Sequence, residues 1–61
     1  MPVIKVEISK QTTEMKKEMI EKITQVMSEI TNIPSQAFIV LINEYEKESI
    51  GVGGIQLSDG K

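Results

Sequence analysis

The sequence predicts a small α/β domain in the order strand, helix, strand, followed by a short glycine-containing hairpin. Three observations support this: an alternating apolar stretch at the start, a helical apolar stripe, and a second apolar run after Pro34. Two strands joined through a helix pair in parallel with a right-handed crossover. We treat residues 1–61 as a single domain, because the chain contains no internal repeat, linker or low-complexity tract.

The first strand is expected over Val3 to Ile8, because apolar and more polar residues alternate there with the two-residue period of a strand. The buried face is assigned to Ile4, Val6 and Ile8. Pro2 has the same parity, so its ring should lean toward that face at the start of the strand. The polar residues Ser9–Lys10–Gln11 are interpreted as the connecting loop.

The helix is expected to begin at Thr12 or Thr13, because either side chain can cap the first backbone amides. It should end between Thr31 and Ile33, since the residue before Pro34 is disfavoured in the helical conformation. Between these limits apolar residues recur every three or four positions and form one stripe. They are Met15, Met19, Ile20, Ile23, Val26, Met27 and Ile30. The charged residues between them are expected to face solvent.

The second strand is expected over Ala37 to Ile42, six apolar residues without alternation. Such a strand is buried on both faces, but one helix covers only one face of a two-stranded sheet. A partner subunit is therefore expected on the other face. The glycine-punctuated segment from Ile50 to Ile55 predicts a tight hairpin that packs on a neighbouring subunit. Ser58 to Lys61 is expected to be frayed.

The length of the chain independently predicts association. Burial of apolar surface contributes roughly 90 kcal/mol for a chain of this size at about 25 cal/mol per Å². Ordering the residues costs about the same, at roughly 1.5 kcal/mol each. The chain has no cysteine and no histidine, so disulfides and the usual zinc sites cannot reinforce it. Oligomerisation is the remaining way to stabilise the folded chain.

Composition argues against several kinds of partner. The net charge is −2 with one tyrosine and one phenylalanine, whereas nucleic-acid binding favours a basic face with stacking rings. No apolar run approaches the roughly 18 residues of a membrane span, and no signal-peptide pattern is present. We therefore expect a cytoplasmic protein with no nucleic-acid or membrane partner.

Composition also narrows the chemistry. Without histidine or cysteine, serine–histidine and thiol mechanisms are excluded. Glu44, Glu46 and Glu48 are interpreted as a solvated loop rather than a metal site. The glycines of residues 51–54 lack the lysine and helix of a phosphate-binding loop. We expect no metal and no cofactor.

The N-terminal amine is the distinctive reactive group that remains. Removal of Met1, usual before a small second residue, would leave Pro2 with a free secondary amine. A strand docked in a sheet would hold that amine in place, unlike most termini. An unperturbed α-amino group has a pKa of roughly 7.7–8.0, near the pH at which a general base works best. Pro2 is therefore the candidate catalytic residue, the alternative being that proline follows methionine by chance.

From Pro2 to about Ser58 the chain resembles the 4-oxalocrotonate tautomerase family. The resemblance rests on the Met-Pro start, Pro34, Ile42–Asn43–Glu44 and Ile50–Gly51–Val52–Gly53–Gly54. It implies a β-α-β protomer, paired into dimers with a four-stranded sheet, and three dimers forming a hexamer. It also implies a cofactor-independent tautomerase or isomerase. In that chemistry the Pro2 amine takes a proton from a small enolisable carbonyl compound, of the 2-oxo acid or enol type, and returns it elsewhere.

The chain departs from this family at the substrate-binding positions. The family arginine before the helix falls in the loop of residues 9–11, where Lys10 offers only a point charge. A second arginine falls on Ile39, and the aromatic wall falls on Ile50. Lys10, Gln11, Ile39 and Ile50 are therefore the candidate substrate-binding residues. Pro2, Ile39 and Ile50 are expected to form an apolar pocket, partly across subunits.

These departures lead to two hypotheses and one alternative. With a carboxylate-binding arginine missing, activity on dicarboxylates should be poor. With one nearby cation missing, Pro2 should be more basic than in arginine-bearing relatives. The alternative is a non-catalytic oligomeric module that keeps the fold with an eroded site.

Overall fold

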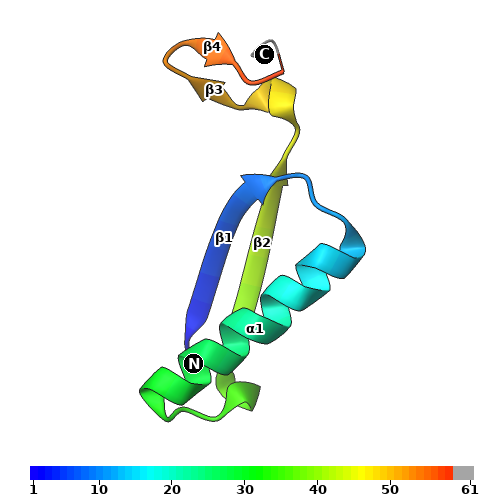
Figure 1. The fold of residues 1–61 in the computed structure, drawn as a ribbon. Coiled ribbons are helices and arrows are strands. Elements are labelled where there is room, and N and C mark those ends of the chain that lie inside the picture. Colours follow the sequence, from blue (N-terminus) through cyan, green and yellow to red (C-terminus); the bar gives the residue numbers. More distant parts are fainter. Residues whose placement is uncertain (59–61) are drawn as a thin grey trace.

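The computed structural model of the protein describes residues 1–58 and confirms the predicted order of elements (Figure 1). Its regular elements are β1 (Val3–Ser9), α1 (Thr13–Thr31), β2 (Ile39–Tyr45), β3 (Gly51–Val52) and β4 (Ile55–Gln56), with 3₁₀ turns at Ser35–Ala37 and Lys47–Ser49. The predicted fraying of the C-terminus lies outside the described residues from position 59 on.

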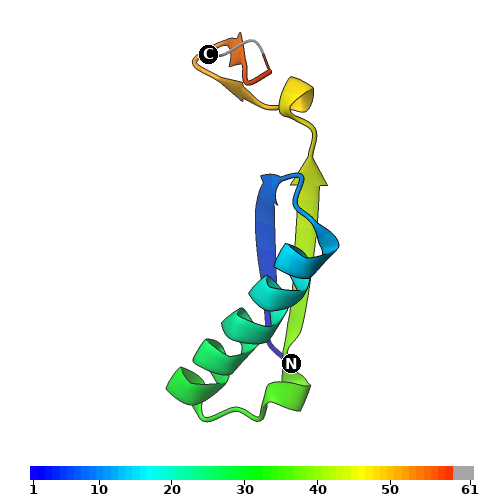
Figure 2. The same ribbon diagram turned by 45° about the vertical axis from the view of Figure 1, so that its right-hand side comes forward.

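β1 and β2 form a parallel two-stranded sheet, as predicted, with α1 on one face (Figures 1 and 2). The ladder runs from Val3 opposite Ile39 to Ser9 opposite Tyr45. β2 therefore begins two residues later than expected and continues for three more. The late start has a local cause, because the chain after Pro34 makes a 3₁₀ turn before it extends. The late end arises because β1 offers ladder partners as far as Ser9.

The helix begins and ends within the predicted limits. The Thr12 hydroxyl accepts a hydrogen bond from the Met15 N–H at 3.1 Å, which satisfies one of the free amides of the first turn. At the other end, Asn32 adopts the left-handed conformation with φ 61° and donates its N–H to the Ser28 carbonyl. No helix within residues 1–58 is long and apolar enough to cross a membrane.

Only part of the apolar stripe on α1 packs against its own sheet. Met19, Ile23 and Met27 are half-buried, as are the sheet residues that face the helix. Those sheet residues are Ile4, Val6, Ile8, Val40 and Ile42. Ile30 and Val26, by contrast, expose 71% and 51% of their surface. The predicted single stripe is therefore wider than the area one protomer covers.

The C-terminal hairpin projects beyond the carboxyl ends of β1 and β2 (Figures 1 and 2). Its turn is made by Gly53 and Gly54, with φ of 62° and 84°, and a two-residue hairpin turn with both values positive strongly favours glycine. Val52 and Ile55 expose 65% and 61% of their surface. The predicted hairpin is confirmed, and its apolar side chains are uncovered in one protomer.

A single protomer does not close a core. Within residues 1–58 no hydrophobic side chain is fully buried. The accessible surface is 4864 Å², whereas a folded chain of this mass exposes about 4,000 Å². The radius of gyration is 14.7 Å, whereas a compact domain of this length has about 10.5 Å. The protomer has the surface of a piece of a larger assembly.

We expect folding and association to be coupled. The melting temperature should rise with protein concentration, because association stabilises the native state by mass action. Thermal unfolding by circular dichroism over about two orders of magnitude in concentration, with sedimentation velocity on the same samples, measures this. A folded monomer with a concentration-independent melting temperature would contradict the expectation.

Candidate active site

Pro2 is docked at the amino-terminal end of the sheet. Its carbonyl accepts a hydrogen bond from the Ile39 N–H at 3.0 Å, and the next residue, Val3, pairs with Ile39 in the ladder. Pro2 itself is half-buried, as its parity predicted. Met1 is 88% exposed, and while it is attached the Pro2 nitrogen is an amide without basic character. The structure thus brings together two predicted site residues, Pro2 and Ile39.

The other predicted site residues lie at the opposite end of the sheet. Lys10 and Gln11 follow β1, and Ile50 follows β2 and its 3₁₀ turn. The length of β1 separates Pro2 from Lys10 by about 26 Å, at about 3.3 Å per residue. Figure 1 shows the N-terminus and the hairpin at opposite ends of the molecule. One protomer therefore does not bring the two groups of predicted site residues together.

Glu44 fixes the loop that carries Lys10 and Gln11. One carboxylate oxygen accepts the Gln11 backbone N–H at 2.8 Å, and the other accepts the Lys16 ammonium at 3.1 Å. These interactions, the Gln11 N–H first and Lys16 next, lower the pKa of the Glu44 carboxyl. The Lys10 N–H also donates to the Tyr45 carbonyl at 3.2 Å. The loop is thus tied to the carboxyl end of β2.

This role of Glu44 was not found from the sequence, where the residue was interpreted as part of a solvated loop. Its partners lie 33 and 28 positions away along the chain. The interaction depends on the parallel register, which places Ile8 opposite Glu44 and so directs the loop after β1 toward it. No local pattern of residue types contains that information.

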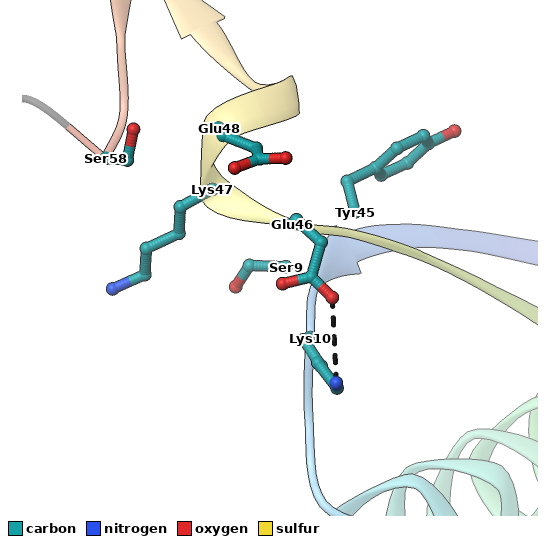
Figure 3. A pocket seen from close by; sticks show the side chains of 7 residues that line it. All are labelled: Ser9, Lys10, Tyr45, Glu46, Lys47, Glu48 and Ser58. Atoms are coloured by element: carbon teal, nitrogen blue, oxygen red, sulfur yellow. Dashed lines mark ion pairs between the residues drawn. The ribbon is translucent and has the colours of Figure 1, made fainter.

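Lys10 already has a partner in the protomer. Its ammonium lies 3.6 Å from a Glu46 carboxylate oxygen, and both side chains are mostly exposed (Figure 3). Such an exposed pair contributes little to stability. Lys47 and Glu48 line the same hollow as this pair. Lys10 is a weak candidate for holding a substrate carboxylate.

Ile50 lines a hollow of about 490 Å³ between the hairpin and the carboxyl end of the sheet. A volume of that size is within the range of small-molecule sites. Its lining residues are Glu7, Ile8, Ser9, Tyr45, Ser49, Ile50, Gly51 and Leu57. Tyr45 was not among the site residues predicted from the sequence, although it is an aromatic residue shortly before Ile50.

A short β-α-β protomer with a proline docked at the start of its first strand, and a glycine hairpin after its second, has the architecture of a small tautomerase. The family model described as tautomerase enzyme matches residues 2–60, and the chain belongs to that family. The expected tautomerase activity, of the isomerase class, is thereby supported at the level of the family. The resemblance to the 4-oxalocrotonate tautomerase family is confirmed.

Individual relatives agree with this assignment. A probable tautomerase from Bacillus cereus is 44% identical over 48 residues, which cover 79% of each chain. The 2-hydroxymuconate tautomerase of Bacillus subtilis is 35% identical over 48 residues, covering 79% of this chain and 77% of that one. A solved 4-oxalocrotonate tautomerase isozyme from Methylibium petroleiphilum is 34% identical, with a TM-score of 0.87 over 98% of this chain and 100% of the other.

We expect the Glu44 clamp to make stability depend on acid pH. Its pKa in the folded state is lowered from the ordinary value of 4.5, so its contribution is fully present above that value and is lost as pH falls through the folded pKa. Glu44→Gln should therefore be less stable than the parent at neutral pH, and the difference should shrink in acid. Denaturant unfolding of both proteins from neutral to acid pH measures it.

Lys16→Met serves as the matched control for the clamp. It removes one partner of the carboxylate and leaves the Gln11 N–H in place, so its loss of stability should be smaller than that of Glu44→Gln. A stability difference between parent and Glu44→Gln that stays constant with pH would contradict the assigned role.

Proposed function

We propose that Pro2, freed by removal of Met1, is the general base of a cofactor-independent tautomerisation. Its secondary amine takes a proton from a small enol or 2-oxo acid and returns it to another atom of the conjugated system. The docking of Pro2 by the 3.0 Å hydrogen bond from Ile39 carries this proposal, because it holds the amine in a fixed position. The amine both accepts and returns the proton, so the reaction needs no cofactor.

The proposed pocket forms between subunits. Pro2 lies about 26 Å from Lys10 in one protomer, and Gln11 and Ile50 lie at the same end as Lys10, so a second copy must bring its carboxyl-end residues to Pro2. The uncovered apolar residues of α1, the open sheet face and the hairpin supply surface for this association. We propose that two protomers form a four-stranded sheet and that three such dimers form a hexamer.

The proposed substrate is a monocarboxylate. Ile39 places an apolar side chain next to Pro2, and Lys10 is paired with Glu46 rather than free for a second carboxylate. The Gln11 side chain donates to the Ser9 carbonyl at 3.1 Å, within its own strand and loop. The Bacillus subtilis relative is named for 2-hydroxymuconate, a dicarboxylate, which makes this enol the comparison substrate.

Location of the protein in the cytoplasm remains a prediction from the sequence.

Replacement of Pro2 tests the base directly. Pro2→Ala should lower kcat/KM for phenylenolpyruvate by roughly 100-fold or more, the usual contribution of a positioned general base. Alanine is also small enough for methionine removal, so the variant keeps a free terminal amine but replaces the ring-held secondary amine with a freely rotating primary amine. Turnover is followed by the loss of enol absorbance.

The intact mass of both proteins is the necessary control, because the proposed base exists only after Met1 has been removed. The parent should have the mass of the chain without methionine. Equal rates with the two processed proteins, neither above the uncatalysed rate of the enol, would support the alternative of a non-catalytic module with an eroded site.

The pH dependence of kcat/KM tests the predicted basicity of Pro2. Activity should fall as pH decreases through the pKa of the amine, near the roughly 7.7–8.0 of an unperturbed α-amino group, because the protonated amine cannot accept a proton. Ile39→Arg places a cation beside Pro2 and should move this acidic limb to lower pH. Glu21→Gln changes the net charge by the same amount at an exposed position in the middle of α1 and should not move it.

An acidic limb well below neutrality in the parent enzyme would contradict the predicted basicity. An Ile39→Arg profile identical to that of the parent would show that the side chain at position 39 does not act on the base.

A further inference from the structure

Tyr45 ends β2 on the sheet face opposite α1. Along β2, exposed positions alternate with the half-buried residues Val40 and Ile42, which face the helix. Tyr45 belongs to the exposed set and retains 39% of its surface. Its hydroxyl lies 3.4 Å from a carboxylate oxygen of Glu7 on the neighbouring strand. Figure 3 shows the ring extending away from the ion pair of Lys10 and Glu46.

The ring of Tyr45 lines the same hollow as Ile50. Leu57 also lines it and is brought close by a 2.8 Å hydrogen bond from its N–H to the Ile50 carbonyl. A hollow lined by one aromatic ring and two aliphatic side chains suits an apolar group of a small molecule. Tyrosine adds a flat surface of large area with little conformational freedom to lose.

The charges around this hollow disfavour an anionic occupant. Glu7 lines it directly and accepts the Tyr45 hydroxyl. A second substrate carboxylate in the hollow would be repelled by the Glu7 carboxylate. An uncharged aryl or alkyl tail meets no such repulsion.

We propose that Tyr45 is a specificity-determining residue whose ring, with Ile50 and Leu57, receives the apolar tail of the substrate. The preferred substrates are then enols of 2-oxo acids with an aryl or extended alkyl substituent. This inference rests on the proposed function, since the reacting carbon must lie near Pro2 of a neighbouring subunit while the tail occupies this hollow.

Substrate discrimination tests the proposal. For each variant, kcat/KM is measured for phenylenolpyruvate and for the short enol of 2-oxobutanoate, and their ratio is compared. Tyr45→Ala should lower the ratio by roughly tenfold, mainly through a higher KM for the aryl substrate, as expected for a lost apolar contact. Tyr45→Phe keeps the ring and should leave the ratio within about twofold of the parent.

Leu41→Ala is the matched control, since Leu41 lies on the same strand and face but does not line the hollow. It should leave the ratio unchanged in protein that assembles like the parent. Equal losses for both substrates in Tyr45→Ala would mean that the ring only supports the structure, and would overturn the proposal.

A binding measurement separates this inference from the role of Pro2. The chain has one tyrosine and no tryptophan, so its intrinsic emission comes from Tyr45 alone. Pro2→Ala protein titrated with 2-oxohexanoate should show saturable quenching, with a midpoint close to the inhibition constant of this compound on the parent enzyme. Emission that does not change at saturating inhibitor would overturn the assignment of Tyr45.

The two proposals fail separately. Normal turnover by processed Pro2→Ala would show that Pro2 is not the general base, but the substrate ratio of Tyr45→Ala could still be measured. An unchanged ratio in Tyr45→Ala would show that Tyr45 does not determine specificity, whether or not Pro2 is the base.

Discussion

The constraint behind the whole structure is that one β-α-β unit has more apolar surface than it can cover by itself. One helix covers one face of a two-stranded sheet and leaves the other face, the far side of its own stripe and the hairpin uncovered. The absence of a fully buried hydrophobic side chain within residues 1–58 is the direct result. Because cysteine and histidine are absent, neither a disulfide nor the usual zinc site can compensate.

The same constraint links assembly to chemistry. Parallel strands place all their starting residues at one end of the sheet and all their following loops at the other. Pro2 and Ile39 therefore meet, whereas Lys10 and Ile50 lie a strand length away. A site that uses both ends is incomplete in one protomer, and the proposed association would complete the core and the pocket together.

The fold was predictable because its signals are local. Period-two alternation from Val3, the three- and four-residue spacing from Met15, and the paired Gly53–Gly54 each define one element without reference to the rest. Element ends were less predictable where pairing decided them. β2 continues to Tyr45 because β1 offers partners there, although the apolar run stops at Ile42.

By itself, the sequence determined the order of elements, and it predicted a partner subunit and Pro2 as the reactive group, since these depend on periodicity, length and residue chemistry. The tertiary structure alone decided that Glu44 anchors the loop after β1, that Glu46 forms an ion pair with Lys10, and that Tyr45 lines the same hollow as Ile50. The physical reason is register: contacts between distant segments depend on how two strands align, and no local pattern of residues records that alignment.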